Sequence, residues 1–362
     1  MFIGLCGTIC AGKHTVAKFL VETYGFQILR LAAPTTTPVP KEDGSSTTDT
    51  VVTSFPDNGN LTFPTIEELL EYVTERWQQM FVMTDISNED MLDTLLKRPF
   101  FILVSVDAPV VVRWKRYIEK CKAYNLSLPT PTLETFVEKA DKHMFDPQTG
   151  LIPLFVRATL HLLNSSTSIE TFYESLKTLD LTDETRLRPT WDAYFMQLAN
   201  LAAQRSNCMK RRVGCVLVRE KRVISTGYNG TPRGLTNCND GGCARCNSAS
   251  AGGSGLSTCL CLHAEENALL EAGRERIGKG SILYCDTCPC LTCSVKIAQV
   301  GISEVVYSQA YSMDNKTADV LSEGGVKLRQ FSPPREGIVL LGQNSDTFTG
   351  TRFYAHADIK NN

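Results

Sequence analysis

The residues with the clearest chemistry are one histidine and two closely spaced cysteines in the C-terminal half of the chain. His263 begins a segment with helical periodicity, and Cys290 and Cys293 begin another directly after Pro289. Cysteines three apart in a first helical turn point to one side of the helix, so both thiolates can bind a single metal ion. Three protein ligands leave the fourth corner of a zinc tetrahedron to water, which is the arrangement of a catalytic zinc site.

Glu265 follows the histidine by two residues and is the expected proton carrier of this site. A carboxylate beside an activated water can accept a proton and release it to a reacting atom. The pattern His-x-Glu followed by Pro-Cys-x-x-Cys resembles the signature of the zinc-dependent nucleobase deaminases. The resemblance implies Zn²⁺ as the cofactor, Glu265 as the catalytic residue, and His263, Cys290 and Cys293 as the metal ligands.

Cys285 and Cys288 form a second Cys-x-x-Cys pair and therefore an alternative register. Cys285 falls on an expected strand, whereas Cys290 follows a proline, and proline is favoured in the first turn of a helix. We favour Cys290 and Cys293 as ligands, and keep the earlier pair as the alternative.

The chain has 14 cysteines, nine of them between Cys238 and Cys293. In a long chain without a recognisable signal segment, clustered cysteines indicate metal binding more often than disulfides. Cys208 and Cys215 are interpreted as free thiols. Five others have spacings that fit a second, structural zinc: Cys238, Cys243, Cys246, Cys259 and Cys261.

Length and charge restrict the class of protein. The chain has 362 residues, enough for two domains, and a formal net charge of −2. Proteins that bind polynucleotides through their phosphates usually carry a basic surplus, so the charge disfavours such a partner. No apolar stretch reaches membrane-spanning length. We expect a soluble intracellular protein, cytoplasmic or nuclear, with no membrane partner.

The order of the expected elements divides the chain into two parts. Alternating strands and helices predict an α/β domain over 1–180, with a flexible insertion at about 34–64 that is rich in Thr, Ser, Pro and Gly. A second domain is expected over 189–332, and a tail over 333–362. The strongest predicted strands of the first domain are the apolar runs at 2–6 and 100–106.

A glycine-rich segment lies between the first predicted strand and helix. Gly7, Gly12 and Lys13 fit the pattern G-x-x-x-x-G-K, and this part of the chain resembles the P-loop NTPases, in particular small nucleotide kinases. The resemblance implies a phosphate-binding loop made by these three residues. His14 stands where the family has the Ser or Thr that holds magnesium, so we predict a degenerate domain without phosphoryl transfer.

Three further runs resemble the eukaryotic, especially fungal, deoxycytidylate deaminases: GYNGTP at 227–232, CLCLHAEENALLEAG at 259–273 and YCDTCPCLTC at 284–293. The resemblance covers about 189–332 and includes a long cysteine-bearing insertion. It implies a cytidine-deaminase-like α-β-α sandwich with a five-stranded mixed sheet, which assembles into homo-oligomers.

The same resemblance implies an activity. It is the deamination of dCMP to dUMP and ammonia, which supplies dUMP for thymidylate synthesis, with dCTP and dTTP as allosteric effectors. Asn229 would hydrogen-bond the nucleotide sugar. Asn229 is also the first residue of an Asn-Gly turn dipeptide, and this structural role is compatible with the functional one.

Three alternatives remain at this stage. The same zinc chemistry could act on a base in tRNA or single-stranded DNA, which the negative net charge disfavours. A non-catalytic zinc module is disfavoured by Glu265 beside a three-ligand site. A nucleotide kinase with an accessory zinc domain is disfavoured by His14.

Overall fold

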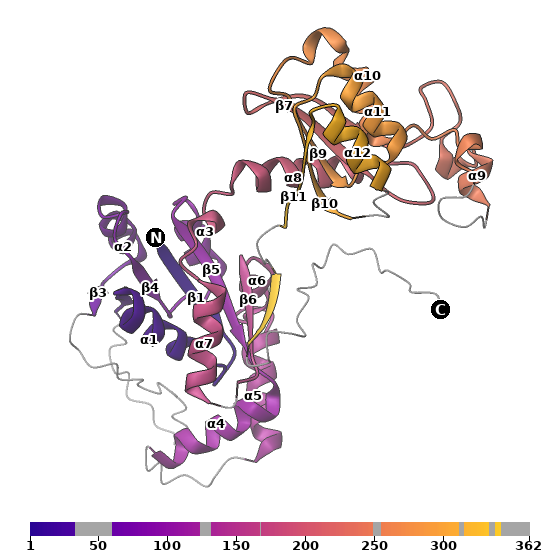
Figure 1. The fold of residues 1–362 in the computed structure, drawn as a ribbon. Coiled ribbons are helices and arrows are strands. Elements are labelled where there is room, and N and C mark those ends of the chain that lie inside the picture. Colours follow the sequence, from indigo (N-terminus) through magenta and orange to yellow (C-terminus); the bar gives the residue numbers. More distant parts are fainter. Residues whose placement is uncertain are drawn as a thin grey trace. The chain divides into compact units, whose positions relative to one another are not determined.

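The computed structural model describes residues 1–32, 60–123, 132–166, 168–248, 255–310, 315–332 and 337–341. The chain divides into two compact units (Figure 1), which are described separately below. The first unit comprises residues 1–188 and the segment after 334, and the second comprises residues 189–334. In the described ranges, no helix has the length and apolar character needed to cross a membrane.

The first unit is built on a parallel sheet of seven strands in the order β12-β6-β5-β1-β4-β2-β3. A parallel sheet is covered on both faces, so its central strands are continuously apolar. Accordingly, β1 is buried at every position and β5 at all but its last. The strands are β1 (Phe2–Gly7), β2 (Gln27–Leu31), β3 (Leu61–Phe63), β4 (Phe81–Met83), β5 (Phe101–Asp107), β6 (Leu160–Asn164) and β12 (Gly337–Leu341).

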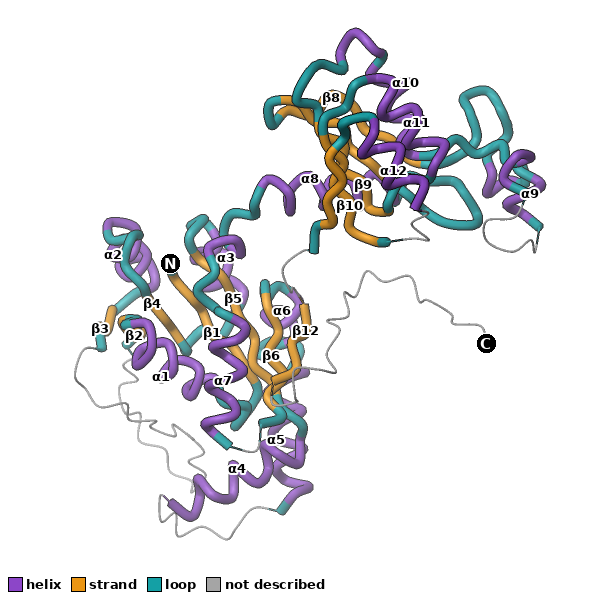
Figure 2. Tube along the Cα trace, in the orientation of Figure 1, coloured by secondary structure: helices purple, strands orange, loops and turns teal. Residues whose placement is uncertain are grey.

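Helices cover both faces of this sheet (Figures 1 and 2). Side chains alternate along β1, so Ile3 and Leu5 pack in one cluster with α1 and α7, while Phe2 and Cys6 pack in another with α2 and α3. The helices are α1 (Lys13–Tyr24), α2 (Ile66–Glu75), α3 (Glu89–Leu96), α4 (Val110–Ala123), α5 (Leu133–Phe145), α6 (Ile152–Val156) and α7 (Ile169–Leu179), followed by the 3-10 turn η1 (Glu184–Arg186).

Two expectations for irregular segments need correction. The predicted insertion 34–64 ends in the short strand β3, which pairs with β2; residues 33–59 lie outside the described part of the chain. The predicted tail 333–362 contains β12, which pairs with β6 and buries Val339 and Leu341. An apolar five-residue run at a sheet edge gains more from this burial than from solvation. Residues 342–362 lie outside the described part.

The second unit is built on a mixed sheet of five strands in the order β11-β10-β9-β7-β8. Strand β7 runs antiparallel to both β8 and β9, whereas β9, β10 and β11 are parallel to one another. The five-stranded mixed sheet expected from the sequence is therefore confirmed. Its strands are β7 (Gly214–Arg219), β8 (Arg222–Tyr228), β9 (Ile282–Thr287), β10 (Glu304–Gln309) and β11 (Lys327–Gln330).

The two faces of this sheet are covered by different helices (Figure 2). Cys215 and Leu217 of β7 pack with the face that carries α10, α11 and α12, whereas Val216 and Val218 pack against α8. The helices are α8 (Trp191–Ala203), α9 (Ala244–Asn247), α10 (Ala264–Ala272), α11 (Leu291–Val300) and α12 (Asn315–Glu323), and the 3-10 turns are η2 (Cys238–Asp240), η3 (Leu256–Thr258) and η4 (Arg274–Arg276).

Candidate active site

Two helix starts on the same face of the second sheet form the centre of the site. His263 is the residue before α10, and Cys290 is the residue before α11, with Cys293 in the first turn. The backbone N–H of His263 donates to the Glu266 carboxylate at 2.9 Å, and the same carboxylate forms an ion pair with Lys296 of α11. The start of α10 is therefore tied to α11.

The three predicted ligands lie together. Nδ1 of His263 is 3.3 Å from the Sγ atoms of both Cys290 and Cys293. Bonds of about 2.0 Å to nitrogen and 2.3 Å to sulfur make the N···S edge of a zinc tetrahedron about 3.5 Å long. The three side chains therefore fit one zinc ion. In the described ranges, Cys285 and Cys288 belong to no group of side chains that could hold a metal.

The backbone of α10 lies directly on the sheet. A β-carbon on Gly227 of β8 would lie 2.0 Å from the Ala264 carbonyl oxygen and 2.6 Å from the Ala268 nitrogen, so only glycine fits there. The Cys215 thiol donates to the Ala264 oxygen at 3.0 Å, and the Ser225 hydroxyl donates to the Ala268 oxygen at 2.8 Å. These contacts fix the helix that carries Glu265.

Glu265 lies in the first turn of α10 and is 4% exposed. Burial raises the pKa of this carboxyl to about 7, although the neighbouring His263 opposes the shift. A carboxyl whose pKa lies near neutral pH can both accept and release a proton, as a proton carrier must.

Contact between the two candidate thiol ligands shifts their pKa values in opposite directions. A hydrogen bond from Cys293, together with one from His263, lowers the pKa of Cys290 to about 3, and the same contact with Cys290 raises the pKa of Cys293. A thiol must lose its proton to bind a metal ion, and the lowered pKa of Cys290 favours the thiolate form of that ligand.

Asn229 directly follows β8 and is engaged in several hydrogen bonds. Its side-chain oxygen accepts from the backbone N–H of Val213 at 2.8 Å and from the Ser206 hydroxyl at 2.7 Å, and its amide donates to the Arg211 oxygen at 2.7 Å. The next residue, Gly230, pairs with Leu262 in an isolated β-bridge. The bridge holds the Asn-Gly turn beside His263.

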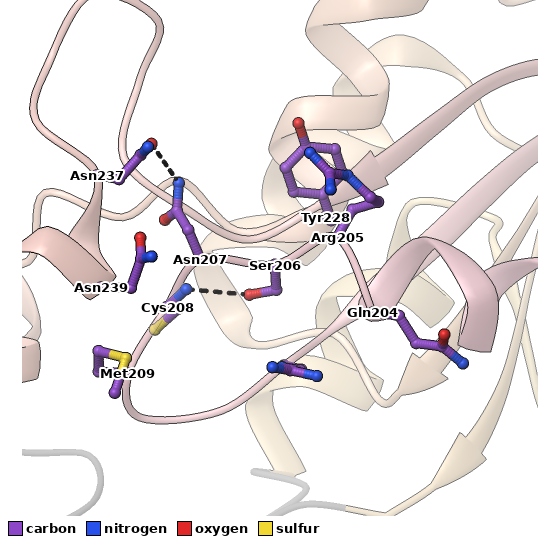
Figure 3. A pocket seen from close by; sticks show the side chains of 10 residues that line it. Gln204, Arg205, Ser206, Asn207, Cys208, Met209, Tyr228, Asn237 and Asn239 are labelled. Atoms are coloured by element: carbon purple, nitrogen blue, oxygen red, sulfur yellow. Dashed lines mark hydrogen bonds between the residues drawn. The ribbon is translucent and has the colours of Figure 1, made fainter.

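A polar cavity of about 340 Å³ opens beside this turn (Figure 3). The Asn207 amide donates to Asn237 across it, and the backbone N–H of Cys208 donates to the Ser206 hydroxyl. Its lining residues are Gln204, Arg205, Ser206, Asn207, Cys208, Met209, Arg212, Tyr228, Asn237 and Asn239.

Some residues of the site could not be selected from the sequence. Ser206 has no recognisable motif around it, and Lys296 is one of many surface-type lysines. Asp286 is 7% exposed; its Oδ2 accepts from the Gly214 N–H at 3.2 Å, and its Oδ1 has no hydrogen-bond partner among the described residues. Burial raises the pKa of Asp286 to about 6. Its only sequence signal was an acidic residue on an otherwise apolar strand.

The glycine-rich segment of the first unit connects β1 to α1. Gly7 ends β1, Gly12 is the residue before α1 with φ of 112°, and Lys13 is the first residue of the helix. Burial lowers the pKa of Lys13, and burial together with Lys13 lowers the pKa of His14 to about 4. The Asn164 amide donates to the Ala11 oxygen and fixes the loop from β6.

Comparison with known proteins identifies the family. Residues 189–309 match the family described as the cytidine and deoxycytidylate deaminase zinc-binding region. The deoxycytidylate deaminase of Schizosaccharomyces pombe is 51% identical over 337 residues, which are 93% of this chain and 99% of the relative. The chain belongs to the deoxycytidylate deaminase family.

A second relative in this family matches over a similar length. The deoxycytidylate deaminase of Saccharomyces cerevisiae is 43% identical over 350 residues, which are 94% of this chain and 100% of the relative. A solved structure of the dCMP deaminase from the cyanophage S-TIM5, in complex with dCMP and dUMP, is 32% identical and covers 40% of this chain and 98% of its own, at a TM-score of 0.33. Membership of the deoxycytidylate deaminase family identifies the second unit as a zinc-dependent hydrolase.

Proposed function

We propose that the second unit hydrolyses dCMP to dUMP and ammonia and thereby supplies dUMP for thymidylate synthesis. The observation that carries the proposal is a buried carboxyl, Glu265, beside three convergent metal ligands in a chain of the deoxycytidylate deaminase family. His263, Cys290 and Cys293 would hold the zinc. When bound, zinc supplies a Lewis acid that activates water at neutral pH.

Glu265 carries the protons in this proposal. The oxygen of water bonds to C4 of the cytosine ring while Glu265 accepts a water proton and delivers it to N3. The bond from C4 to the exocyclic nitrogen then breaks. Glu265 transfers the remaining hydroxyl proton to the departing amine, which leaves as ammonia, and the new C4–O bond becomes the carbonyl of dUMP. Its raised pKa suits both transfers.

We assign the nucleotide phosphate to the polar cavity beside the Asn-Gly turn. Arg205 and Arg212 are the cationic side chains among its lining residues. A guanidinium group can donate two parallel hydrogen bonds to the oxygens of one phosphate. In this assignment Arg212→Gln raises KM for dCMP but leaves kcat/KM for deoxycytidine, which lacks the phosphate, within about two-fold. Equal losses on both substrates would contradict the assignment.

Asn229 is proposed to contact the nucleotide sugar with the amide hydrogen that does not face Arg211. Asn229→Ala is expected to raise KM for dCMP more than ten-fold, because it removes this contact and the three internal hydrogen bonds. The matched control is Ser206→Ala, which removes one of those internal bonds but keeps the amide. Because Ser206 also lines the cavity assigned to the phosphate, both variants are compared on deoxycytidine, which lacks the phosphate. If the control loses as much as the Asn229 variant on that substrate, Asn229 is only structural.

The activity is tested by measuring ammonia release from dCMP, CMP, deoxycytidine and single-stranded DNA side by side, together with zinc content. We expect preference for dCMP, because the chain lacks the basic surplus of a polynucleotide-binding protein. Glu265→Gln should keep zinc and lose at least ~10²-fold in kcat. Glu271→Gln, an exposed carboxylate on the same helix, should change neither quantity. Comparable rates on single-stranded DNA would favour the editing alternative instead.

For the first unit we propose a degenerate P-loop fold that binds phosphate without transferring it. The support is the strand–loop–helix around Gly7, Gly12 and Lys13, with the half-buried lysine at the helix start. His14, kept neutral by its low pKa, offers no hydroxyl for magnesium. Lys13→Ala should weaken the binding of inorganic pyrophosphate and leave dCMP deamination unchanged. ATP-dependent phosphorylation of a nucleotide by the unmodified chain would refute the degenerate assignment.

We extend the proposal to assembly and regulation, supported by the family resemblance. The chain would form homo-oligomers that dCTP activates and dTTP inhibits. Sedimentation velocity and initial rates over a range of dCMP concentrations, with each effector present, test this directly. A monomer whose rate neither effector changes would contradict it.

A further inference from the structure

Six thiols of the second unit lie together outside the catalytic centre. They come from three segments. The first is the segment after α8, with Cys208. The second contains η2 and α9, with Cys238, Cys243 and Cys246, and the third precedes α10, with Cys259 and Cys261. All six are reduced. The Sγ of Cys246 is 3.7 Å from Cys208, 3.6 Å from Cys259 and 3.9 Å from Cys261, far beyond the roughly 2 Å of a disulfide bond.

These sulfur–sulfur distances match a zinc–thiolate site. With Zn–S bonds of about 2.3 Å, the edge of a zinc tetrahedron is about 3.8 Å long. The thiols form two groups of four, and within each group all sulfur atoms lie within 4.8 Å of one another. The first group is Cys208, Cys238, Cys246 and Cys261, and the second is Cys243, Cys246, Cys259 and Cys261.

The two groups share one pair of sulfurs, Cys246 and Cys261. A single zinc ion accepts four thiolates, so it would leave two of the six cysteines unused at contact distance. Two tetrahedra that share an edge use all six cysteines, two as bridging ligands and two as terminal ligands of each ion. We therefore propose that this cluster binds two zinc ions bridged by the thiolates of Cys246 and Cys261.

The surroundings of the cluster favour thiolates. The backbone N–H of Met209 donates to Cys238 Sγ at 3.4 Å, and that of Leu260 donates to Cys243 Sγ at 3.4 Å. The Arg245 side chain interacts with the sulfurs of Cys246 and Cys259. Hydrogen bonds from outside the ligand set orient metal ligands and stabilise their charge.

In this proposal Cys208 is a metal ligand, whereas the sequence alone placed this residue among the free thiols. It lies 30 residues before the next ligand, on a segment that also lines the polar cavity. Two ions at this position would join the end of α8, the insertion and the segment leading to His263. Their function would be structural, because every coordination position is filled by protein.

Metal analysis of the full chain tests the stoichiometry. We expect about three zinc ions per chain in the unmodified protein and about two in His263→Ala, which loses only the catalytic ion. Cys246→Ser removes a shared ligand and should lower the content by about two, whereas Cys208→Ser should lower it by about one. Cys121→Ser, on α4 of the first unit, is the control and should retain all three. About two ions in the unmodified protein and one in His263→Ala would establish a mononuclear site and overturn the proposal.

X-ray absorption spectroscopy of His263→Ala tests the proposal without changing any cysteine of the cluster. In this protein only the cluster metals remain, and two tetrahedra that share an edge place their centres roughly 3 Å apart. We expect a sulfur-only first shell and a zinc–zinc distance of that size. A sulfur shell without the zinc–zinc distance would refute the bridged pair, and it would leave the deaminase assignment unaffected.

Discussion

Gly227 of β8 allows the backbone of α10 to pack closely on the sheet, and replacing it with alanine is expected to move the catalytic carboxyl. The added β-carbon would lie 2.0 Å from the Ala264 oxygen, about 1.4 Å short of ordinary contact, and the obstacle is backbone, not a flexible side chain. Because α10 carries Glu265 in its first turn, the helix can relieve the overlap only by carrying the carboxyl away from the sheet. A displacement of about 1 Å costs a catalytic group on the order of 10²-fold in rate.

The assay is kcat for dUMP formation at saturating dCMP, with zinc content and urea unfolding measured on the same samples. Gly227→Ala should lower kcat by ~10²-fold and stability by about 1–3 kcal/mol. Gly214→Ala is the matched control, since its β-carbon would lie 2.2 Å from the Ala199 oxygen of α8, on the opposite face of the sheet. It should destabilise comparably and keep kcat within a few-fold. A folded, zinc-loaded Gly227 variant with normal kcat would refute the reasoning.

Three further predictions follow from single contacts. In the folded chain the pKa of Asp286 is about 6, above its ordinary value of 3.8. The protonated carboxyl therefore stabilises the fold below pH 4, and this stability is lost as the pH rises through 6. In urea titrations, the free energy of unfolding of Asp286→Asn relative to the unmodified chain should increase by up to about 3 kcal/mol between pH 4 and 7. Lys296→Met removes a half-exposed ion pair with Glu266 and should lower stability by less than about 1 kcal/mol without loss of zinc, as measured by unfolding and metal analysis. Arg329→Met breaks partly exposed pairs with Asp192 and Glu304, so we expect a loss of about 1–2 kcal/mol by the same titration.

The candidate zinc site was predictable because its signals are local in the sequence. Two helix starts, each marked by a short motif, were enough to select His263, Glu265, Cys290 and Cys293. The strands that hold these helices were also predictable, because the continuous apolar runs of β7 and β9 follow directly from burial on both faces of the sheet. What the sequence could not supply were partners fixed by tertiary packing, such as Cys208 in the thiol cluster.

The first unit was less predictable for physical reasons. Its strands β3 and β4 have three residues each, too few for any periodicity to be recognised. The central strands β1 and β5 were predicted because they are long, apolar and buried. β12 was missed because a five-residue apolar run, far along the chain from its neighbour β6, has no local feature that indicates pairing.

The late position of β12 has a consequence for biosynthesis. Its neighbour β6 ends at Asn164, and β12 begins at Gly337, so about 170 residues are translated between them. At ordinary elongation rates this takes roughly 10 to 35 s, during which the outer edge of β6 has no partner strand. Domains usually mature in the order of their synthesis. The complete second unit is therefore synthesised before β12 is available to pair with β6 and complete the sheet of the first unit.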